Sequence, residues 1–399
     1  MKIPFSPPDI SEQDIANVVD ALRSGWITTG PKTKQLEKDL SAYCGTAHTA
    51  CLNSATAALE LSLRVLGIGP GDEVITSAYT YTASCSVICH VGATPVLIDV
   101  DEGSYHMSAA NLEKAITPKT KAVIPVDIGG VPADYDAIFS VLEGKKDLFT
   151  PASDLQKAIG RVAVVADAAH SVGATYKGRQ IGSVADFTCF SFHAVKNLTT
   201  AEGGSATWLD FPGIDGEEIY RQFMLLSLHG QTKDALSKTK LGAWEYDIVS
   251  PAYKCNMTDI LAGLGQSQLE RYPQLLAERR SVVARYDAAF AGKLEIMPHY
   301  TGEYQSSGHL YLTRIPGYSL EKRNALIERI AEKGVATNVH YKPLPLLSAY
   351  KNLGFDIADY PNAYAQFINE MTLPLYSTLT DEQVEYVIAA VLQSLEEDV

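Results

Sequence analysis

One lysine, Lys196, stands in a setting suited to covalent chemistry. It follows an apolar, β-favouring run (residues 187–192), with Ser191 and His193 before it and a Gly-Gly pair after it. A lysine at this place is poorly positioned for packing, and lysine amines form imines with carbonyl groups. The alternative is a solvated surface lysine, the usual fate of this residue type. The flanking residues favour the imine-forming lysine.

An acidic residue upstream offers a partner for a carbonyl cofactor. Asp167 directly follows an apolar strand-like run, and open α/β sheets bind ligands at the carboxyl ends of their parallel strands. A buried carboxylate is costly unless it is paired, and a protonated pyridine nitrogen is a suitable partner. A helix N-cap is the other interpretation of Asp167. Together with Lys196, 29 residues later, it predicts a pyridoxal phosphate site.

Such a site also needs an anion cradle and an aromatic lid. Ser191 and the turn 53–56, Asn-Ser-Ala-Thr, are candidates for the phosphate, because the turn opens a helix whose free N–H groups attract anions. Simple N-capping by Ser54 is compatible with that role. Tyr81 could stack on the cofactor ring or could be a core aromatic. His170 could reach the ring hydroxyl or the ring face, or could be a packed histidine.

Composition narrows the function classes. The chain has 399 residues and a net charge of −14, which argues against a general nucleic-acid binder. No apolar run reaches the roughly 20 residues that span a bilayer, and the N-terminus has no signal-peptide pattern. We therefore expect a cytoplasmic protein without nucleic-acid or membrane partners. Cys85, Cys89 and His90 could suggest a metal site, but two buried thiols on one helix face are favoured, because no second ligand pair follows.

Strand-like and helix-like segments alternate through the first part of the chain, which predicts an α/β fold with a mostly parallel sheet covered on both faces. The expected strands are 48–52, 73–76, 95–100, 121–126, 162–166, 187–192 and 205–209. The expected helices are 11–25, 33–44, 54–66, 81–91, 133–142 and 216–228, with a surface insertion at 141–160 and a long loop after 228.

The last part of the chain reads differently. A long helical pattern runs from Thr258 to about Phe290, and a smaller α+β domain follows it. We expect a large domain at 1–257 and a small one at 258–399. The small domain should hold strands at 309–314 and 335–340 and helices at 319–333, 360–370 and 380–397.

Several motifs together resemble the DegT/DnrJ/StrS family of pyridoxal phosphate-dependent sugar-nucleotide aminotransferases, and the resemblance covers nearly the whole chain. It is closest to the subgroup that acts on UDP-4-keto sugars, such as UDP-4-amino-4-deoxy-L-arabinose aminotransferase. The motifs are Ser-Gly-Trp-Ile-Thr-Thr-Gly-Pro (24–31), Asn-Ser-Ala-Thr-Ala (53–57), Gly-Asp-Glu-Val-Ile-Thr (71–76), Asp-Ala-Ala-His (167–170), Ser-Phe-His-Ala-Val-Lys-Asn (191–197), Ala-Glu-Gly-Gly (201–204), His-Gly (229–230) and Tyr-Lys-Cys-Asn-Met-Thr-Asp (253–259).

The resemblance implies a fold-type I aminotransferase and a role for each matching residue. Lys196 would carry the internal aldimine, Asp167 would bind the ring nitrogen and Tyr81 would stack on the ring. His170 falls where many members have Gln beside the ring. The phosphate would be held by Ala55, Thr56 and Ser191.

The resemblance further implies a homodimer with shared active sites. Lys254 or Asn256 would reach the phosphate in the partner subunit, and the departure from the family's Asn-x-Arg pattern leaves the choice open. The residues that would contact the nucleotide sugar are Trp26, Thr28, His229, His309, Tyr311, His340 and Tyr341.

The function that follows is amino transfer. L-Glutamate would convert the cofactor to pyridoxamine phosphate, which would aminate the keto group, at C4, of a UDP-linked 4-keto 6-deoxy sugar for cell-surface polysaccharide or lipopolysaccharide. A dTDP-keto-sugar 3- or 4-aminotransferase is the alternative. A sugar deoxygenase is disfavoured because such family members replace the lysine with histidine. A non-catalytic regulator is disfavoured because neither a DNA-binding appendage nor a degraded cofactor site is visible.

Overall fold

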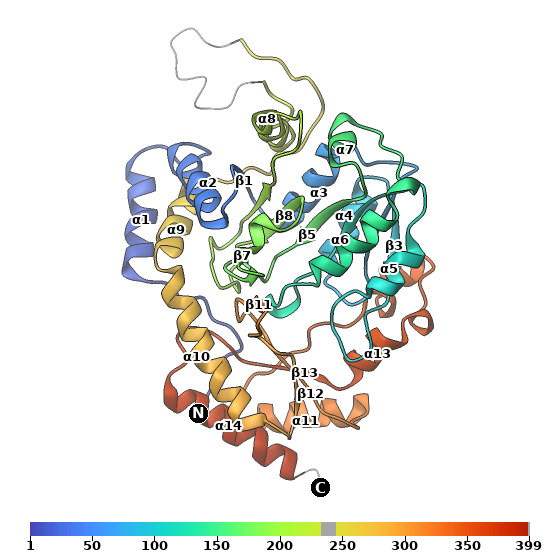
Figure 1. Cartoon of the computed structure of the whole chain (residues 1–399). Helices are drawn as coiled ribbons and strands as arrows, with labels where there is room; N and C mark the ends of the chain where they lie inside the picture. The colour runs from blue at the N-terminus through green and yellow to red at the C-terminus, as the bar shows by residue number, and fades with distance from the viewer. Residues whose placement is uncertain (233–244, 398–399) are drawn as a thin grey trace.

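The computed structural model describes residues 1–232 and 245–397. A seven-stranded sheet at its centre has the order β1-β9-β8-β5-β4-β2-β3 (Figure 1). Its strands are β1 (His48–Leu52), β2 (Glu73–Ser77), β3 (Thr94–Ile98), β4 (Thr120–Ile124), β5 (Ala163–Asp167), β8 (Phe187–Ser191) and β9 (Gly204–Trp208). The pairs from β3 to β8 are parallel, and β9 alone is reversed, because it pairs antiparallel with both β8 and β1. The sheet is therefore mostly parallel, as predicted.

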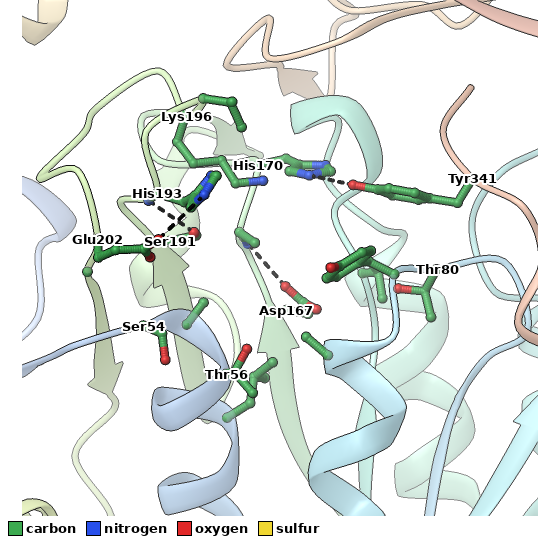
Figure 2. A pocket seen from close by; sticks show the side chains of 18 residues that line it. Ser54, Thr56, Thr80, Asp167, His170, Ser191, His193, Lys196, Glu202 and Tyr341 are labelled. Atoms are coloured by element: carbon green, nitrogen blue, oxygen red, sulfur yellow. Dashed lines mark hydrogen bonds and ion pairs between the residues drawn. The ribbon is translucent and has the colours of Figure 1, made fainter. Parts of the chain in front are cut away.

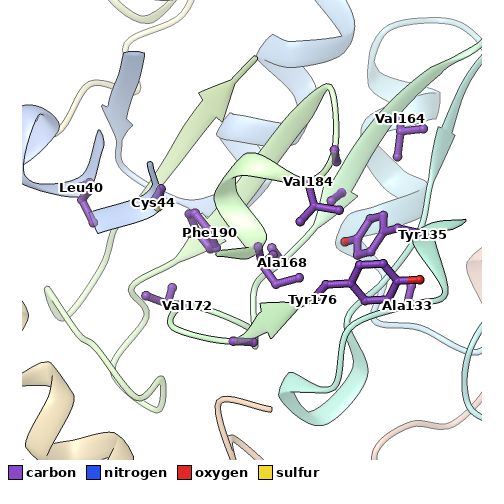
Figure 3. Close-up of a cluster of buried hydrophobic side chains, with 14 of the residues drawn as sticks. Leu40, Cys44, Ala133, Tyr135, Val164, Ala168, Val172, Tyr176, Val184 and Phe190 are labelled. Atoms are coloured by element: carbon purple, nitrogen blue, oxygen red, sulfur yellow. The ribbon is translucent and has the colours of Figure 1, made fainter. Parts of the chain in front are cut away.

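Apolar clusters bury both faces of this sheet. Along β5, Val164 and Ala166 belong to the cluster on one face, whereas Ala163 and Val165 belong to the cluster on the other. Successive strand residues point to opposite faces, so a wholly apolar strand requires cover on both sides. Figure 3 shows part of the first cluster, in which Val164 lies near Tyr135 and Phe190 lies near Cys44.

The helices divide between the two faces. Residues of α2, α5 and α6 belong to the first cluster, and residues of α3, α4, α7 and α8 belong to the second. These helices are α2 (Pro31–Cys44), α3 (Ala55–Val65), α4 (Ala83–His90), α5 (Ala109–Ala115), α6 (Tyr135–Gly144), α7 (Asp154–Ile159) and α8 (Gly216–Ser227). The predicted surface insertion at 141–160 is partly packed, because α7 buries Leu155 and Gln156 against the second face.

Two carboxylates join the N-terminal helices to residues far along the chain. The buried Asp14, in α1 (Glu12–Arg23), accepts hydrogen bonds from Gln268 and Arg271 at 2.8 Å each. Asp259, at the start of α9 (Asp259–Glu270), accepts the backbone N–H groups of Gly30 and Thr33 at 2.8 and 2.9 Å. Asp259 thereby caps the first turn of α2, where the helix's free N–H groups need acceptors.

The C-terminal part has its own apolar cluster and a three-stranded antiparallel sheet, β10-β12-β13. Figure 1 shows it, with α11 and α14, at the end of the molecule away from α8. Its elements are α10 (Tyr272–Phe290), β10 (Glu295–Ile296), β12 (Tyr311–Arg314), α11 (Leu320–Glu332), α12 (Ser348–Asn352), α13 (Pro361–Ile368), β13 (Glu370–Leu373) and α14 (Asp381–Glu396). The division between residues 257 and 258 stays a prediction.

Two expected elements differ in the structure. The helix predicted from Thr258 to Phe290 is broken at Arg271, because Pro273 cannot donate the N–H that a continuous helix needs. The strand predicted at 335–340 does not form. Val335 and Asn338 make only isolated bridges there, and the edge of the sheet is taken by β13, whose polar residues hid its pattern.

Short elements complete the described residues. A second three-stranded sheet joins β6 (Thr175–Tyr176), β7 (Arg179–Gln180) and β11 (Tyr304–Gln305), and 3-10 turns lie at Ile128–Gly130, Lys146–Leu148, Ile181–Ser183, Leu344–Leu346 and Ile357–Asp359. No helix in the described part of the chain is long and apolar enough to cross a membrane. The loop predicted after residue 228 lies partly outside the described residues.

Candidate active site

A cavity of about 330 Å³ opens where the carboxyl ends of β5 and β8 meet the first turn of α3. Most of the predicted cofactor residues line it (Figure 2). Parallel strands deliver their last residues to one edge of a sheet, which explains why positions far apart in sequence converge here. The predicted residues that line the cavity are Ala55, Thr56, Tyr81, Asp167, His170, Ser191, Lys196 and Tyr341.

Asp167 ends β5 and lies on the cavity wall with 5% of its surface exposed. Its carboxylate accepts the Ser84 hydroxyl at 2.6 Å and the Ala169 N–H at 3.2 Å. Burial raises the pKa of Asp167, while those donors and the charge of Lys196 oppose the rise. No cation makes an ion pair with this carboxylate among the described residues, so a bound cation would stabilise it.

Lys196 extends into the same cavity beside His170 (Figure 2). Burial lowers the pKa of its amino group to about 8, and the Asp167 carboxylate opposes that shift. A lysine with an ordinary pKa is almost wholly protonated near neutrality and is a poor nucleophile. The lowered pKa gives Lys196 a useful neutral fraction, as imine formation requires.

The first turn of α3 forms the opposite wall. Ser54 caps the helix by accepting the Ala57 N–H at 3.1 Å, and the residues between them line the cavity. Gly204 lets this turn approach the sheet, because a Cβ on Gly204 would lie 2.4 Å from the Ala55 nitrogen. Ser191, at the end of β8, lines the same cavity. The arrangement suits an anion at a helix N-terminus.

Aromatic residues border the remaining side. Tyr81 is 60% exposed, and its ring centroid lies 5.8 Å from that of Tyr341. The Tyr341 hydroxyl lies 3.0 Å from His170 Nε2. Burial, with the nearby charge of Lys196, holds the pKa of His170 well below its usual range, so the ring is neutral.

Other predicted substrate residues lie outside the cavity wall. His309 is buried behind His170, with ring centroids 4.5 Å apart. Tyr311 is fully buried, and its hydroxyl donates to Asp287 at 2.8 Å. His340 is half-buried, and its Nδ1 lies 2.9 Å from the Thr372 hydroxyl. These contacts with substrate stay predictions, and the burial of Tyr311 speaks for a packing role.

Five further predicted residues, Trp26, Thr28, His229, Lys254 and Asn256, are also outside the cavity wall. Trp26 is half-buried and donates from Nε1 to the Thr29 carbonyl at 3.0 Å, whereas Thr28 and His229 are exposed. Asn256 is buried and hydrogen-bonded to the Thr29 hydroxyl, and the exposed Lys254 is hydrogen-bonded to the Asn256 side-chain oxygen.

Some residues at the cavity wall or directly behind it were missed from the sequence. Ser84 holds Asp167 and also lies 2.8 Å from the Thr80 hydroxyl. Their spacing of four residues at the start of a helix was the available signal. Glu202 also lines the cavity, 3.7 Å from His193. Within the described residues, no cluster of three or more His, Cys, Asp or Glu side chains could hold a metal ion.

Comparison with known proteins identifies this architecture. The model of the DegT/DnrJ/EryC1/StrS aminotransferase family matches residues 8–392. The chain belongs to this family. The spore coat polysaccharide biosynthesis protein SpsC of Bacillus subtilis (strain 168) is 40% identical over 98% of this chain and 96% of its own length.

Solved structures agree with the assignment. Spr1654 from Streptococcus pneumoniae, described as a sugar aminotransferase, matches with TM-scores of 0.97 in both its PLP form and its PMP form. It is 61% identical in the PMP form, over the full length of both chains. PseC of Helicobacter pylori, an aminotransferase in pseudaminic-acid biosynthesis, matches with a TM-score of 0.87 and 26% identity over both full chains. The predictions of the family, of the aminotransferase fold and of a transaminase are confirmed.

Proposed function

We propose that this aminotransferase uses pyridoxal 5′-phosphate to move the amino group of L-glutamate onto C4 of a UDP-linked 4-keto 6-deoxy sugar. The observation that carries the proposal is the convergence of Asp167 and Lys196 in one cavity beside the first turn of α3. The cofactor, when bound, supplies an electron sink that the side chains lack. PLP and PMP forms of Spr1654 support the choice of cofactor.

The wall residues fit this cofactor. Asp167 is a buried carboxylate that gains from a cationic ring nitrogen, and Lys196 has the neutral amine needed to bind an aldehyde and to carry a proton between carbon centres. Ala55, Thr56 and Ser191 line the cavity and would hold the phosphate. Tyr81 is exposed beside the cavity, where it can cover one ring face.

The sugar and the partners of the enzyme belong to the same proposal. The name of SpsC, a spore coat polysaccharide biosynthesis protein, supports a role in cell-surface polysaccharide biosynthesis. The cytoplasmic location expected from the sequence is part of the proposal. A homodimer is supported by exposed apolar side chains that lead up to and include the first residue of the Tyr-Lys-Cys-Asn segment, which a second copy would cover. These residues are Tyr246, Ile248, Val249 and Tyr253, each 43–56% exposed.

The variant Lys196→Ala tests the core of the proposal. The loaded parent should absorb at roughly 410–430 nm, and the variant should lose both this band and amino transfer. Lys177→Ala is the matched control, because Lys177 is exposed and pairs with Asp136 outside the cavity. A retained band in Lys196→Ala would refute the lysine assignment.

A substrate panel tests the sugar. The purified enzyme with glutamate should turn over a UDP-4-keto 6-deoxy sugar faster than its dTDP counterpart and faster than a 3-keto sugar, measured as 2-oxoglutarate released. Preference for a dTDP-linked or 3-keto sugar would replace the UDP-4-keto assignment while leaving the aminotransferase intact.

A further inference from the structure

Both ring nitrogens of His170 are engaged by this chain's own atoms. The backbone N–H of Gly129 donates to His170 Nδ1 at 3.2 Å, and Nε2 lies 3.0 Å from the Tyr341 hydroxyl oxygen. Because Nδ1 accepts a hydrogen bond, it carries no hydrogen. The neutral ring must therefore carry its hydrogen on Nε2, which donates to Tyr341.

The loop that supplies this N–H is held firmly. Gly129 has a φ of 64°, and a Cβ on the neighbouring Gly130 would lie 2.1 Å from Ser307 Oγ and 2.9 Å from the His170 carbonyl oxygen. His309 and Ser307 also donate their backbone N–H groups to this loop, at 3.0 and 3.1 Å. The loop cannot easily move away, so the tautomer of His170 is set by the backbone.

Tyr341 consequently has a hydrogen to give. Its oxygen already accepts from His170, and none of the hydrogen bonds found among the described residues uses its own O–H as a donor elsewhere. Burial raises the pKa of the Tyr341 hydroxyl above its usual range, so the group stays protonated. The ring lines the same cavity as Lys196 and Asp167 (Figure 2).

We propose that Tyr341, and not His170, donates the hydrogen bond to the anionic ring oxygen of the cofactor, with His170 as the positioning residue that orients the hydroxyl. This rests on the proposed cofactor site at Lys196 and goes beyond it. His170 has no free N–H to offer that oxygen, whereas Tyr341 has one. A residue from the segment between α11 and α12 thus completes a site otherwise built on the central sheet.

The donor has an electronic consequence. With the cofactor bound, a hydrogen bond to its ring oxygen would withdraw negative charge from that oxygen. The nearby nitrogen atom of Lys196 would then hold its proton less tightly. Removing the donor should therefore raise the pH at which that nitrogen loses its proton. Hydrogen bonds to charged groups are worth enough to move this pH by about one unit.

The experiment is a pH titration of the visible absorbance of cofactor-loaded protein. Tyr341→Phe should shift the midpoint upward by about one unit. Tyr350→Phe is the matched control, because that hydroxyl joins the same C-terminal part to the Thr82 carbonyl at 3.1 Å but does not line the cavity. Its midpoint should equal that of the parent. An unchanged midpoint in Tyr341→Phe would overturn the proposal.

A second measurement needs no cofactor and no variant. ¹⁵N NMR of the histidines in the parent protein should show His170 as the neutral tautomer with hydrogen on Nε2. A hydrogen on Nδ1 would overturn the proposal even if the Phe variant failed to fold.

If the parent itself binds no pyridoxal phosphate, the proposed function fails. If the parent binds it and only the midpoint of Tyr341→Phe is unmoved, this inference alone fails.

Discussion

The two sides of the cavity are built in different ways. Asp167, Ser191 and Lys196 come from the ends of adjacent sheet strands and the loop that follows, whereas Tyr341 comes from an irregular segment of the C-terminal part. The sheet fixes the first group through its register, since Asp167 pairs with Cys189 on β8. The second group depends on how the C-terminal part packs against the sheet. We expect substitutions on the sheet side to abolish or greatly slow amino transfer. Substitutions on the C-terminal side should change its pH dependence or the stability of the fold instead.

After the loss of Lys196, substitution of Asp167 should cause the largest fall in the rate of amino transfer. Asp167→Asn should slow the half-reaction with glutamate by roughly 10²–10⁴-fold, because breaking a buried ion pair costs about 3–5 kcal/mol. Stopped-flow absorbance measures the rate, and Asp154→Asn, at an exposed carboxylate, is the control. A change of less than tenfold would mean that the carboxylate is not the partner of the ring nitrogen.

A smaller effect is expected from the backbone contact between β9 and α3. Gly204→Ala should destabilise the fold by about 1–3 kcal/mol and weaken cofactor binding, because the new Cβ displaces the first turn of α3. Urea unfolding and a cofactor titration measure the two effects. Gly144→Ala is the control, since a Cβ there meets nothing within 4 Å. If Gly204→Ala is destabilised but still binds the cofactor tightly, the first turn of α3 does not hold the phosphate.

The pH dependence of cofactor uptake follows from Lys196. Its pKa is lowered to about 8, so the reactive neutral amine increases as pH rises towards 8 and levels off above it. The rate of cofactor attachment to the empty protein should rise about tenfold per pH unit below that value. A rate that continues to climb to pH 10 would mean that the amine keeps its ordinary pKa.

The smallest effect is expected on the C-terminal side, away from the cavity wall. Tyr311→Phe should cost about 1 kcal/mol of unfolding free energy through the lost hydrogen bond to Asp287. It should leave KM for the sugar unchanged, as steady-state kinetics would show. A raised KM with unchanged stability would restore Tyr311 as a substrate contact.

The same contrast explains what the sequence could predict. The apolar strands, the residues that end them and Ser54 at a helix start are local patterns, so the sheet and the cofactor side of the cavity were predictable. The hydrogen bond between Gly129 and His170 joins residues 41 positions apart, and the hydrogen bond between His170 and Tyr341 joins residues 171 positions apart. Such contacts depend on packing between distant segments, which no local pattern reports.

The capping of α2 by Asp259 bears on how the protein is made. The carboxylate that caps α2 belongs to Asp259, and the side chain that pairs with Asp14 in α1 belongs to Arg271. Both partners therefore lie more than 200 residues after the helices that they hold. A ribosome has therefore translated about two thirds of the chain before α1 can dock against α9 and before Asp259 can cap α2. Until then the face of α1 that packs against α9 remains uncovered, and chaperones can protect it during this interval of synthesis.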